Sequence, residues 1–555
     1  MPFFLQNIIH MALSPTRNPQ SAIRRSEQSM IDSPPYASTG SAPLTLGKAF
    51  ILTLSASLCA SAQASPDPAQ GFAPSAVQRV EKALARIDSL DGDYGAVIAL
   101  NREAALAQAR AIDEDGPVNP PVAAELIGEP ILLKDNIESL ELATTAGSLA
   151  LADNATGRDA DLVRQLRDAG AVILGKTNLS EWANFRSEHS ISGWSAVGGQ
   201  TRNAVDRARS PCGSSAGSAV AVALGYVRVA IGTETSGSIV CPASVNGVVG
   251  FKPTHGLVSG AGIVPLALSQ DTAGPIAQNV SLAALTLAAI ANPDVGPAAP
   301  IVDGLLGVAS LASLKGMRVG VFANTQGYDP RRDRELQKTL TAFEKEGAIL
   351  VQGLRITPYE GFSAHSYDVL LYEFRRDLNH YLASRPNAHT QLQLDSLIAF
   401  NEAHALEELR YFDQSIFIKS RDIADSEAEY LEKREAIRRA MREDGLDQLF
   451  AEHDLDLLVG ITESPAWMID TVNGDALFGP GMAAQAAIAG NPHITLPLGA
   501  VAGLPLGISL VGERWLDHKL AQTAYRLEQL LPAPSYAESR QAGYAERKLQ
   551  PELQE

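Results

Sequence analysis

Cysteine is scarce in this chain. Three cysteines occur in 555 residues, and only Cys212 and Cys241 lie beyond the N-terminal segment described below. A large domain with two cysteines needs no disulfide, even in an oxidising compartment. We therefore expect Cys212 and Cys241 to be buried thiols.

Metal-binding motifs are absent as well. The sequence has no His-Glu-x-x-His, no Cys-x-x-Cys and no paired-histidine spacing. Catalytic zinc needs such closely spaced nitrogen and sulfur ligands, so a metallohydrolase is disfavoured. We expect neither a metal nor another cofactor.

Basic residues are fewer than acidic residues. The chain has 45 Lys and Arg against 63 Asp and Glu, a net charge of -18. Nucleic acids and anionic membrane surfaces attract basic proteins, so neither is expected as a partner. The sequence also lacks heptads, internal repeats and low-complexity tracts, and it does not fix the oligomeric state.

The N-terminal apolar run is short. Ala49 to Cys59 is about 11 residues long, whereas a membrane helix needs about 20, so no membrane span is expected. Lys48 precedes the run, and small residues ending in Ala62-Gln63-Ala64 follow it, an order typical of a secretory signal cleaved after Ala64. We expect residues 1–64 to be removed and the protein to be periplasmic or secreted. A disordered tail is the alternative.

The rest of the chain alternates between helical and strand patterns. A Ser-x-x-Gln cap and spaced apolar residues predict a helix from Ser75. Residues 159–174 predict a helix and then a strand, and apolar runs at 317–322 and 455–461 predict further strands. With 45% hydrophobic residues the chain can bury a large core, and the alternation predicts an α/β fold, a mixed, mostly parallel β-sheet covered by α-helices.

The segment 210–253 contains two glycine-rich serine turns. These are Gly213-Ser214-Ser215 and Ser236-Gly237-Ser238, and a run of small apolar residues joins them. Glycine beside serine lets the backbone approach a reacting carbonyl, and successive N–H groups in such a turn can face a developing oxyanion. The pattern predicts a nucleophile site, with an ordinary serine-rich loop as the alternative.

This segment resembles the amidase signature family. That family has a Gly-Ser-Ser turn, a small-residue helix and a Gly-Thr-(Asp/Glu)-x-x-Gly-Ser-Ile turn, here residues 232–239, with an upstream strand lysine, here Lys134. The resemblance covers roughly residues 75–530 and implies a single domain over 65–555 with a helical insertion. Further matching motifs are Thr144-Thr145-Ala146-Gly147-Ser148, Gly175-Lys176-Thr177-Asn178, Phe251-Lys252-Pro253-Thr254, Asp271-Thr272-Ala273-Gly274-Pro275 and Gly490-Asn491-Pro492.

The resemblance implies a serine amidase with a Ser-Ser-Lys triad. Ser238 is the nucleophile, Lys134 is the base, and Ser214, after a cis peptide bond, relays the proton between them. The oxyanion hole is implied to be the backbone N–H groups of Thr235, Ser236, Gly237 and Ser238.

Lys134 has the setting that this chemistry needs. A lysine is a base near pH 7 only if burial lowers its pKa by several units from about 10.4. Lys134 follows the apolar run Ile131-Leu132-Leu133, which predicts a buried strand that carries the amine inside. A strand-end lysine that reaches solvent is the alternative.

Within the family, the sequence is similar to bacterial peptide amidases, which hydrolyse the C-terminal amide of peptides. The turn Ser238-Ile239-Val240-Cys241-Pro242 is shared with them, and most relatives have an arginine at the position of Val240. Its absence removes an anchor for acidic substrates. A small-molecule or peptide amide is therefore the expected substrate.

Four alternatives stay open. A general aliphatic or aryl amidase and the transamidating subunit of a tRNA-dependent amidotransferase share the triad. A non-catalytic binding protein on the same scaffold is disfavoured because all three positions are occupied. Gly213 to Gly217 also matches Gly-x-Ser-x-Gly, which would make Ser215 a hydrolase nucleophile, but no histidine is marked as its partner.

Residues 330–450 are rich in charged, helix-favouring sequence, notably 367–382 and 432–442. We expect a solvated helical cap here. The alternative is that these helices form a wall of the substrate cleft.

Overall fold

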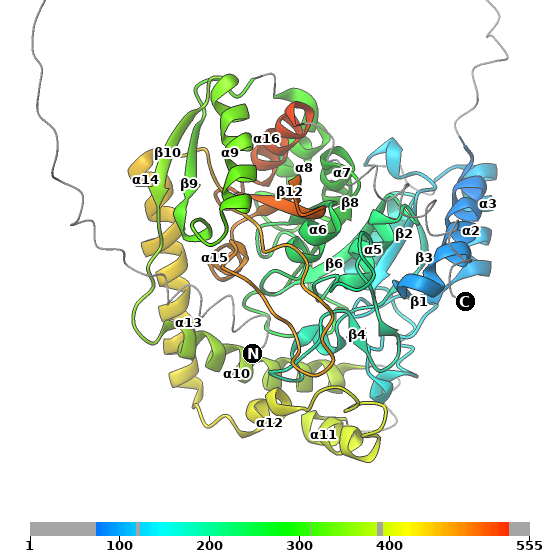
Figure 1. Ribbon diagram of the computed structural model, residues 1–555. Coiled ribbons are helices and arrows are strands. Elements are labelled where there is room, and N and C mark those ends of the chain that lie inside the picture. The colour runs from blue at the N-terminus through cyan, green and yellow to red at the C-terminus, as the bar shows by residue number, and fades with distance from the viewer. Residues whose placement is uncertain (1–73, 118–121, 312, 386–391, 532–555) are drawn as a thin grey trace, which may run out of the picture. The chain divides into compact units, whose positions relative to one another are not determined.

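The computed structural model describes residues 74–117, 122–311, 313–385 and 392–531 (Figure 1). The predicted signal segment, residues 1–64, lies outside these ranges and stays a prediction. The helix expected after Ser75 is confirmed: α2 begins at Ala76, and the side chains of Ser75 and Gln78 each accept from the other residue's backbone N–H.

An 11-stranded sheet forms the centre of the fold. The strands that the sequence predicted near residues 132, 173, 319 and 458 are all part of it. In their order across the sheet the strands are β1 (Val97–Leu100), β3 (Val172–Thr177), β2 (Pro130–Lys134), β6 (Val229–Glu234), β8 (Thr272–Ala277), β7 (Val249–Lys252), β12 (His493–Val501), β13 (Leu504–Val511), β11 (Leu457–Ile461), β9 (Arg318–Phe322) and β10 (Ile349–Leu354). A separate small ribbon pairs β4 (Trp194–Ser195) with β5 (Gly199–Gln200).

The predicted mixed sheet covered by helices is confirmed, but antiparallel pairs outnumber the parallel pairs that were expected to predominate. Parallel pairing occurs on the two flanks, in β3-β2-β6 and in β11-β9-β10. The strands between β6 and β11 pair antiparallel, as does the edge strand β1. Antiparallel β8 brings residues 271–272 back beside the end of β6, with Glu234 opposite Thr272.

Helices cover both faces of the sheet. Among the described residues, no helix is both long and apolar enough to cross a membrane. The helices are α2 (Ala76–Tyr94), α3 (Arg102–Asp115), α4 (Asp161–Asp168), α5 (Ala216–Ala223), α6 (Val240–Asn246), α7 (Val280–Ile290), α8 (Ala298–Leu306), α9 (Pro330–Lys345), α10 (Phe362–Ser384), α11 (Leu394–Ala403), α12 (Ser415–Asp422), α13 (Glu427–Met441), α14 (Gln448–His453), α15 (Ala483–Ala489) and α16 (Asp517–Leu530).

The alternation of side chains along β2 decides where Lys134 points. Successive strand side chains face opposite sides of a sheet. Leu133 packs into the core layer that contains α7, α8 and α16, whereas Leu132 packs into the layer that contains α2, α5 and α6. Lys134 is two residues after Leu132, so its side chain enters the face covered by α5 and α6.

Most of the segment 330–450 is helical. Its longest helix, α10, contacts α11, α12 and α13. Apolar side chains of α10, among them Phe374 and Leu378, share a buried cluster with Phe185 and Leu266 from the α/β part of the chain. These helices are thus packed against residues that border the site described next.

Candidate active site

Lys134 ends β2 and is completely buried. Its Nζ lies 2.7 Å from Ser214 Oγ, 2.8 Å from Thr233 Oγ1 and 3.2 Å from the Thr233 carbonyl oxygen. Burial lowers the pKa of the Lys134 ammonium to about 7, although the negative charges of Asp271 and Glu234 act in the opposite direction. The amine is therefore able to act as a base near neutral pH.

Ser214 lies in the turn that precedes α5. The Gly213–Ser214 peptide bond is cis, as the family resemblance implies. Glycine is required before it, because a Cβ on Gly213 would lie 2.2 Å from Ser180 Oγ. The next hydroxyl, Ser215 Oγ, donates to the Thr233 carbonyl and accepts from the Thr233 N–H, so Ser215 joins α5 to β6 and is not the exposed nucleophile of a hydrolase turn.

Ser238 lies in the turn between β6 and α6 and is also buried. Gly237 has a φ of 96°, which places it in the region that favours glycine. Within the described ranges, Ser238 Oγ has no hydrogen-bond partner, and the backbone N–H groups of Ser236 and Ser238 have no protein acceptor. The turn therefore holds an unengaged hydroxyl beside unengaged N–H donors.

The structure brings the two serine turns together. The Ser215 N–H donates to the Ser238 carbonyl oxygen over 3.2 Å. Lys134 and Ser214 are in direct contact, whereas Ser238 Oγ makes no hydrogen bond to either of them in the described chain. The structure thus shows a Lys134–Ser214 pair with Ser238 on the adjoining turn, and the roles of these three residues stay a prediction.

The prediction of two free thiols is wrong. Cys212 and Cys241 form a disulfide, with their Cα atoms 6.1 Å apart. Cys212 precedes the Ser214 turn and Cys241 follows the Ser238 turn, so the contact between the turns also brings the two cysteines together. The cysteine count could not show this, because pairing depends on which turns meet. Trp467, whose indole N–H donates to Asp475, packs against the disulfide.

Two carboxylates fix the Ser238 turn, and their role was not foreseen. Glu234 Oε2 accepts from the backbone N–H groups of Ile239 and Val240, at 2.8 and 3.1 Å. Asp271 Oδ1 accepts from Thr235 Oγ1 at 2.5 Å. Both residues belong to the family-like motifs, which is the one sequence signal that pointed to them.

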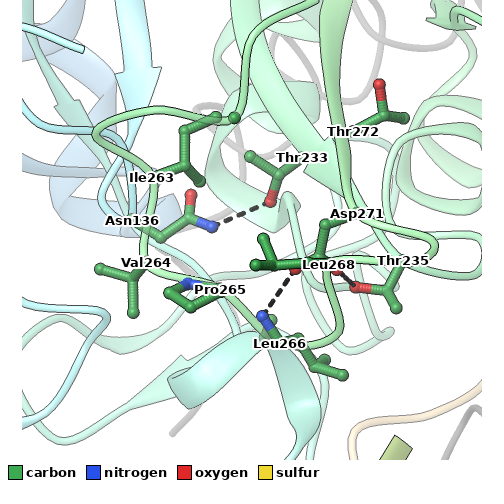
Figure 2. A pocket seen from close by; sticks show the side chains of 12 residues that line it. Asn136, Thr233, Thr235, Ile263, Val264, Pro265, Leu266, Leu268, Asp271 and Thr272 are labelled. Atoms are coloured by element: carbon green, nitrogen blue, oxygen red, sulfur yellow. Dashed lines mark hydrogen bonds between the residues drawn. The ribbon is translucent and has the colours of Figure 1, made fainter. Parts of the chain in front are cut away.

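A pocket that is partly open to solvent adjoins the Lys134 side of the site (Figure 2). Asn136 at its edge donates to Thr233 Oγ1, the atom that also contacts Lys134. Among the described residues, no three His, Cys, Asp or Glu side chains are grouped as metal ligands. The pocket is lined by Asn136, Ala183, Thr233, Thr235, Gly260, Ile263, Val264, Pro265, Leu266, Leu268, Asp271 and Thr272.

Known proteins that are similar to this chain are amidases and a subunit of an amidotransferase. The sequence model of the Amidase family matches residues 78–521. A probable amidase of Arabidopsis thaliana is 36% identical over 470 residues, which are 81% of this chain and 86% of that protein. The crystal structure of a peptide amidase from Stenotrophomonas maltophilia is 41% identical, with a TM-score of 0.72 over 82% of this chain and 93% of that one. One subunit of the glutamyl-tRNA(Gln) amidotransferase of Nitratidesulfovibrio vulgaris is 33% identical over 466 residues, 81% of this chain and 92% of that protein.

Proposed function

Because this chain belongs to the amidase signature family and is therefore a hydrolase of amide bonds, we propose that its substrates are peptides that end in a carboxamide. The products are the peptide acid and ammonia. The observation that carries the chemistry is the buried contact between Lys134 Nζ and Ser214 Oγ, on the turn next to Ser238.

Two observations support peptide amides as the substrate. One is the likeness to a peptide amidase along most of both chains. The other is the position of Val240, which is completely buried and uses its backbone N–H to bind Glu234. The turn consequently presents no cationic side chain to an acidic substrate, and an uncharged peptide-like amide suits it better.

In the proposed reaction, Ser238 Oγ attacks the carboxamide carbon. Ser214 Oγ takes the proton of Ser238 and passes its own proton to neutral Lys134. The same path then returns a proton to the leaving nitrogen, so ammonia departs and an acyl ester on Ser238 remains. Water attacks this ester by the same proton transfers, and the acid is released.

The contacts of Lys134 suit this step. A neutral amine has two hydrogens and one lone pair. Thr233 offers two acceptors, its carbonyl oxygen and its hydroxyl, at hydrogen-bond distance from Nζ. Once both hydrogens point to Thr233, the lone pair is left for the hydroxyl of Ser214.

The backbone N–H groups of the Ser238 turn are the proposed oxyanion donors. Those of Ser236 and Ser238 have no acceptor in the described protein and are available to a substrate oxygen. Donors of this kind are commonly worth about 3 to 4 kcal/mol each in the transition state. Thr235 and Gly237, from the same turn, complete the proposed set, but the Gly237 N–H also hydrogen-bonds to the Glu234 carboxylate.

Export is a separate proposal. A signal peptide over residues 1–64 would deliver the protein to the periplasm or the medium. The Cys212–Cys241 disulfide supports this location, because disulfides persist in oxidising compartments and are rare in the cytosol. N-terminal sequencing of the protein purified from its native host tests it: a first residue near Ser65 is expected, and an uncleaved N-terminus in the cytosol contradicts it.

The substrate proposal is tested by ammonia release from three groups of compounds: amidated dipeptides, aryl amides and short aliphatic amides. We expect the peptide amides to be hydrolysed with the highest kcat/KM, and Ser238→Ala to abolish release. Turnover of aryl or aliphatic amides alone would replace the proposal with a general amidase. Activity in the Ser238→Ala variant would refute the assigned nucleophile.

A further inference from the structure

The pocket beside Thr235 adjoins the proposed reaction centre but has no part in the proton transfers. It shares Thr233 with the Lys134 site and Thr235 with the Ser238 turn. The leaving group of a primary carboxamide is ammonia, which has no side chain. A pocket with an apolar wall at this place therefore serves the acyl half of the substrate.

We propose that this pocket binds the side chain of the residue that carries the cleaved carboxamide, and that it selects uncharged, apolar side chains. The inference rests on the proposed function and deepens it. One wall of the pocket is formed by apolar residues of a single loop between β7 and β8. That loop contributes Ile263, Val264, Pro265, Leu266 and Leu268 (Figure 2).

The pocket offers no free negative charge to a lysine or arginine side chain. Asp271 is the carboxylate among its lining residues, and both of its oxygens are already engaged. Oδ1 accepts from Thr235 Oγ1, and Oδ2 accepts from the N–H groups of Leu266 and Ala267 at 2.7 and 2.9 Å. Burial also raises the pKa of Asp271 to about 7, so its carboxyl is only partly ionised near neutral pH.

The apolar wall is held in place before any substrate arrives. Its backbone N–H groups at positions 266 to 269 all donate to carboxylates. The first two donate to Asp271, that of Leu268 to Asp377 Oδ2 at 3.0 Å, and that of Ser269 to Glu373 Oε2 at 3.1 Å. Asp377 and Glu373 come from α10, so the helical segment 330–450 supports this wall directly.

Leu268 is a suitable residue for the test, because it lines the pocket and is 49% exposed. Shortening its side chain should therefore cost little stability. The experiment compares kcat/KM for N-acetylated dipeptide amides ending in glycine, leucine, phenylalanine or lysine. Wild-type protein should favour leucine and phenylalanine over glycine and lysine by about tenfold or more. Leu268→Ala should reduce the preference for leucine over glycine about fivefold, since it removes apolar contact in the pocket.

Leu406→Ala is the matched control, because Leu406 is 87% exposed and is not part of the pocket. Its preference should equal that of the wild type, and melting temperatures should show that both variants fold. An unchanged preference in Leu268→Ala, or a lysine amide cleaved as well as a leucine amide, would overturn the pocket assignment alone. Absence of ammonia from every peptide amide with wild-type protein would instead refute the proposed function on which the assignment depends.

Discussion

Cys212 and Cys241 form a disulfide that joins the turn of Ser214 to the turn of Ser238. The bond closes a loop between positions 29 apart in the sequence, and the loop contains both serines of the proposed triad and Glu234. The disulfide therefore restrains the position of Ser214, the proposed relay, relative to Ser238, the proposed nucleophile.

Removing this disulfide should lower both stability and activity. A loop of this length contributes about 3 to 4 kcal/mol in the chain-entropy account, so the Cys212→Ser/Cys241→Ser variant should unfold at lower urea concentration. Its kcat should fall about tenfold, because the two turns are no longer tied. Urea titrations and kinetics with and without reductant measure this. Reductant should lower the stability and kcat of the wild type but not those of the variant. Equal kcat in the wild type and the variant would show that the disulfide does not position the two serine turns.

The pH dependence of the reaction should report Lys134. Its pKa is lowered to about 7 by burial, and the base must be neutral to accept a proton. The value of kcat/KM should therefore rise about tenfold per pH unit below pH 7 and level off above it. Lys134→Arg, which stays charged, should be inactive at every pH, and activity in that variant would exclude Lys134 as the base.

Asp271→Asn provides a second check on the same titration. The charge of Asp271 favours the protonated form of Lys134 and so raises its pKa. Removing that charge should move the midpoint of the kcat/KM profile to lower pH. A midpoint that moves upward or does not move would contradict the electrostatic coupling between the two residues.

Local patterns in the sequence were enough to predict part of this structure. The Ser75 cap, the strand before Lys134 and the two serine turns each depend on neighbouring residues, and each is found where it was expected. The prediction of two thiols at Cys212 and Cys241 was wrong, because a disulfide between them depends on how distant turns meet. The contact between Thr235 and Asp271 likewise requires β8 to pair antiparallel with β6, which no local pattern reveals.

Glu234→Ala should reduce activity by more than its loss of stability can explain. The Glu234 carboxylate accepts hydrogen bonds from the N–H groups of Ile239 and Val240. The turn of Ser238 lies between these two residues and β6. We expect kcat to fall about 10- to 100-fold with little change in KM, because the oxyanion donors of the turn are no longer held in position. Glu528→Ala is the matched control, since Glu528 accepts from the Val280 N–H at the start of α7, in the layer away from the site. Loss of kcat in both variants to the same extent would point to general destabilisation.

A buried ion cluster around Arg186 should contribute to the stability of the folded protein. Arg186 is completely buried and lies 2.5 Å from Glu181 and 3.2 Å from Glu408, which is 222 positions away in the sequence. Its guanidinium also lies over the ring of Phe412 at 4.3 Å.

Arg186→Met should lower the free energy of unfolding by about 3 to 5 kcal/mol, because two carboxylates lose their buried cation. Burial already raises the pKa of Glu181 well above its usual value, so the variant should be least stable at high pH, where Glu181 must ionise without its cation. Urea unfolding at pH 6 and pH 9 measures this. Arg331→Met is the control, since the Arg331 side chain is 60% exposed in its pair with Asp329 and should contribute little. Equal stability of Arg186→Met and wild type at both pH values would show that the cluster is not needed for folding.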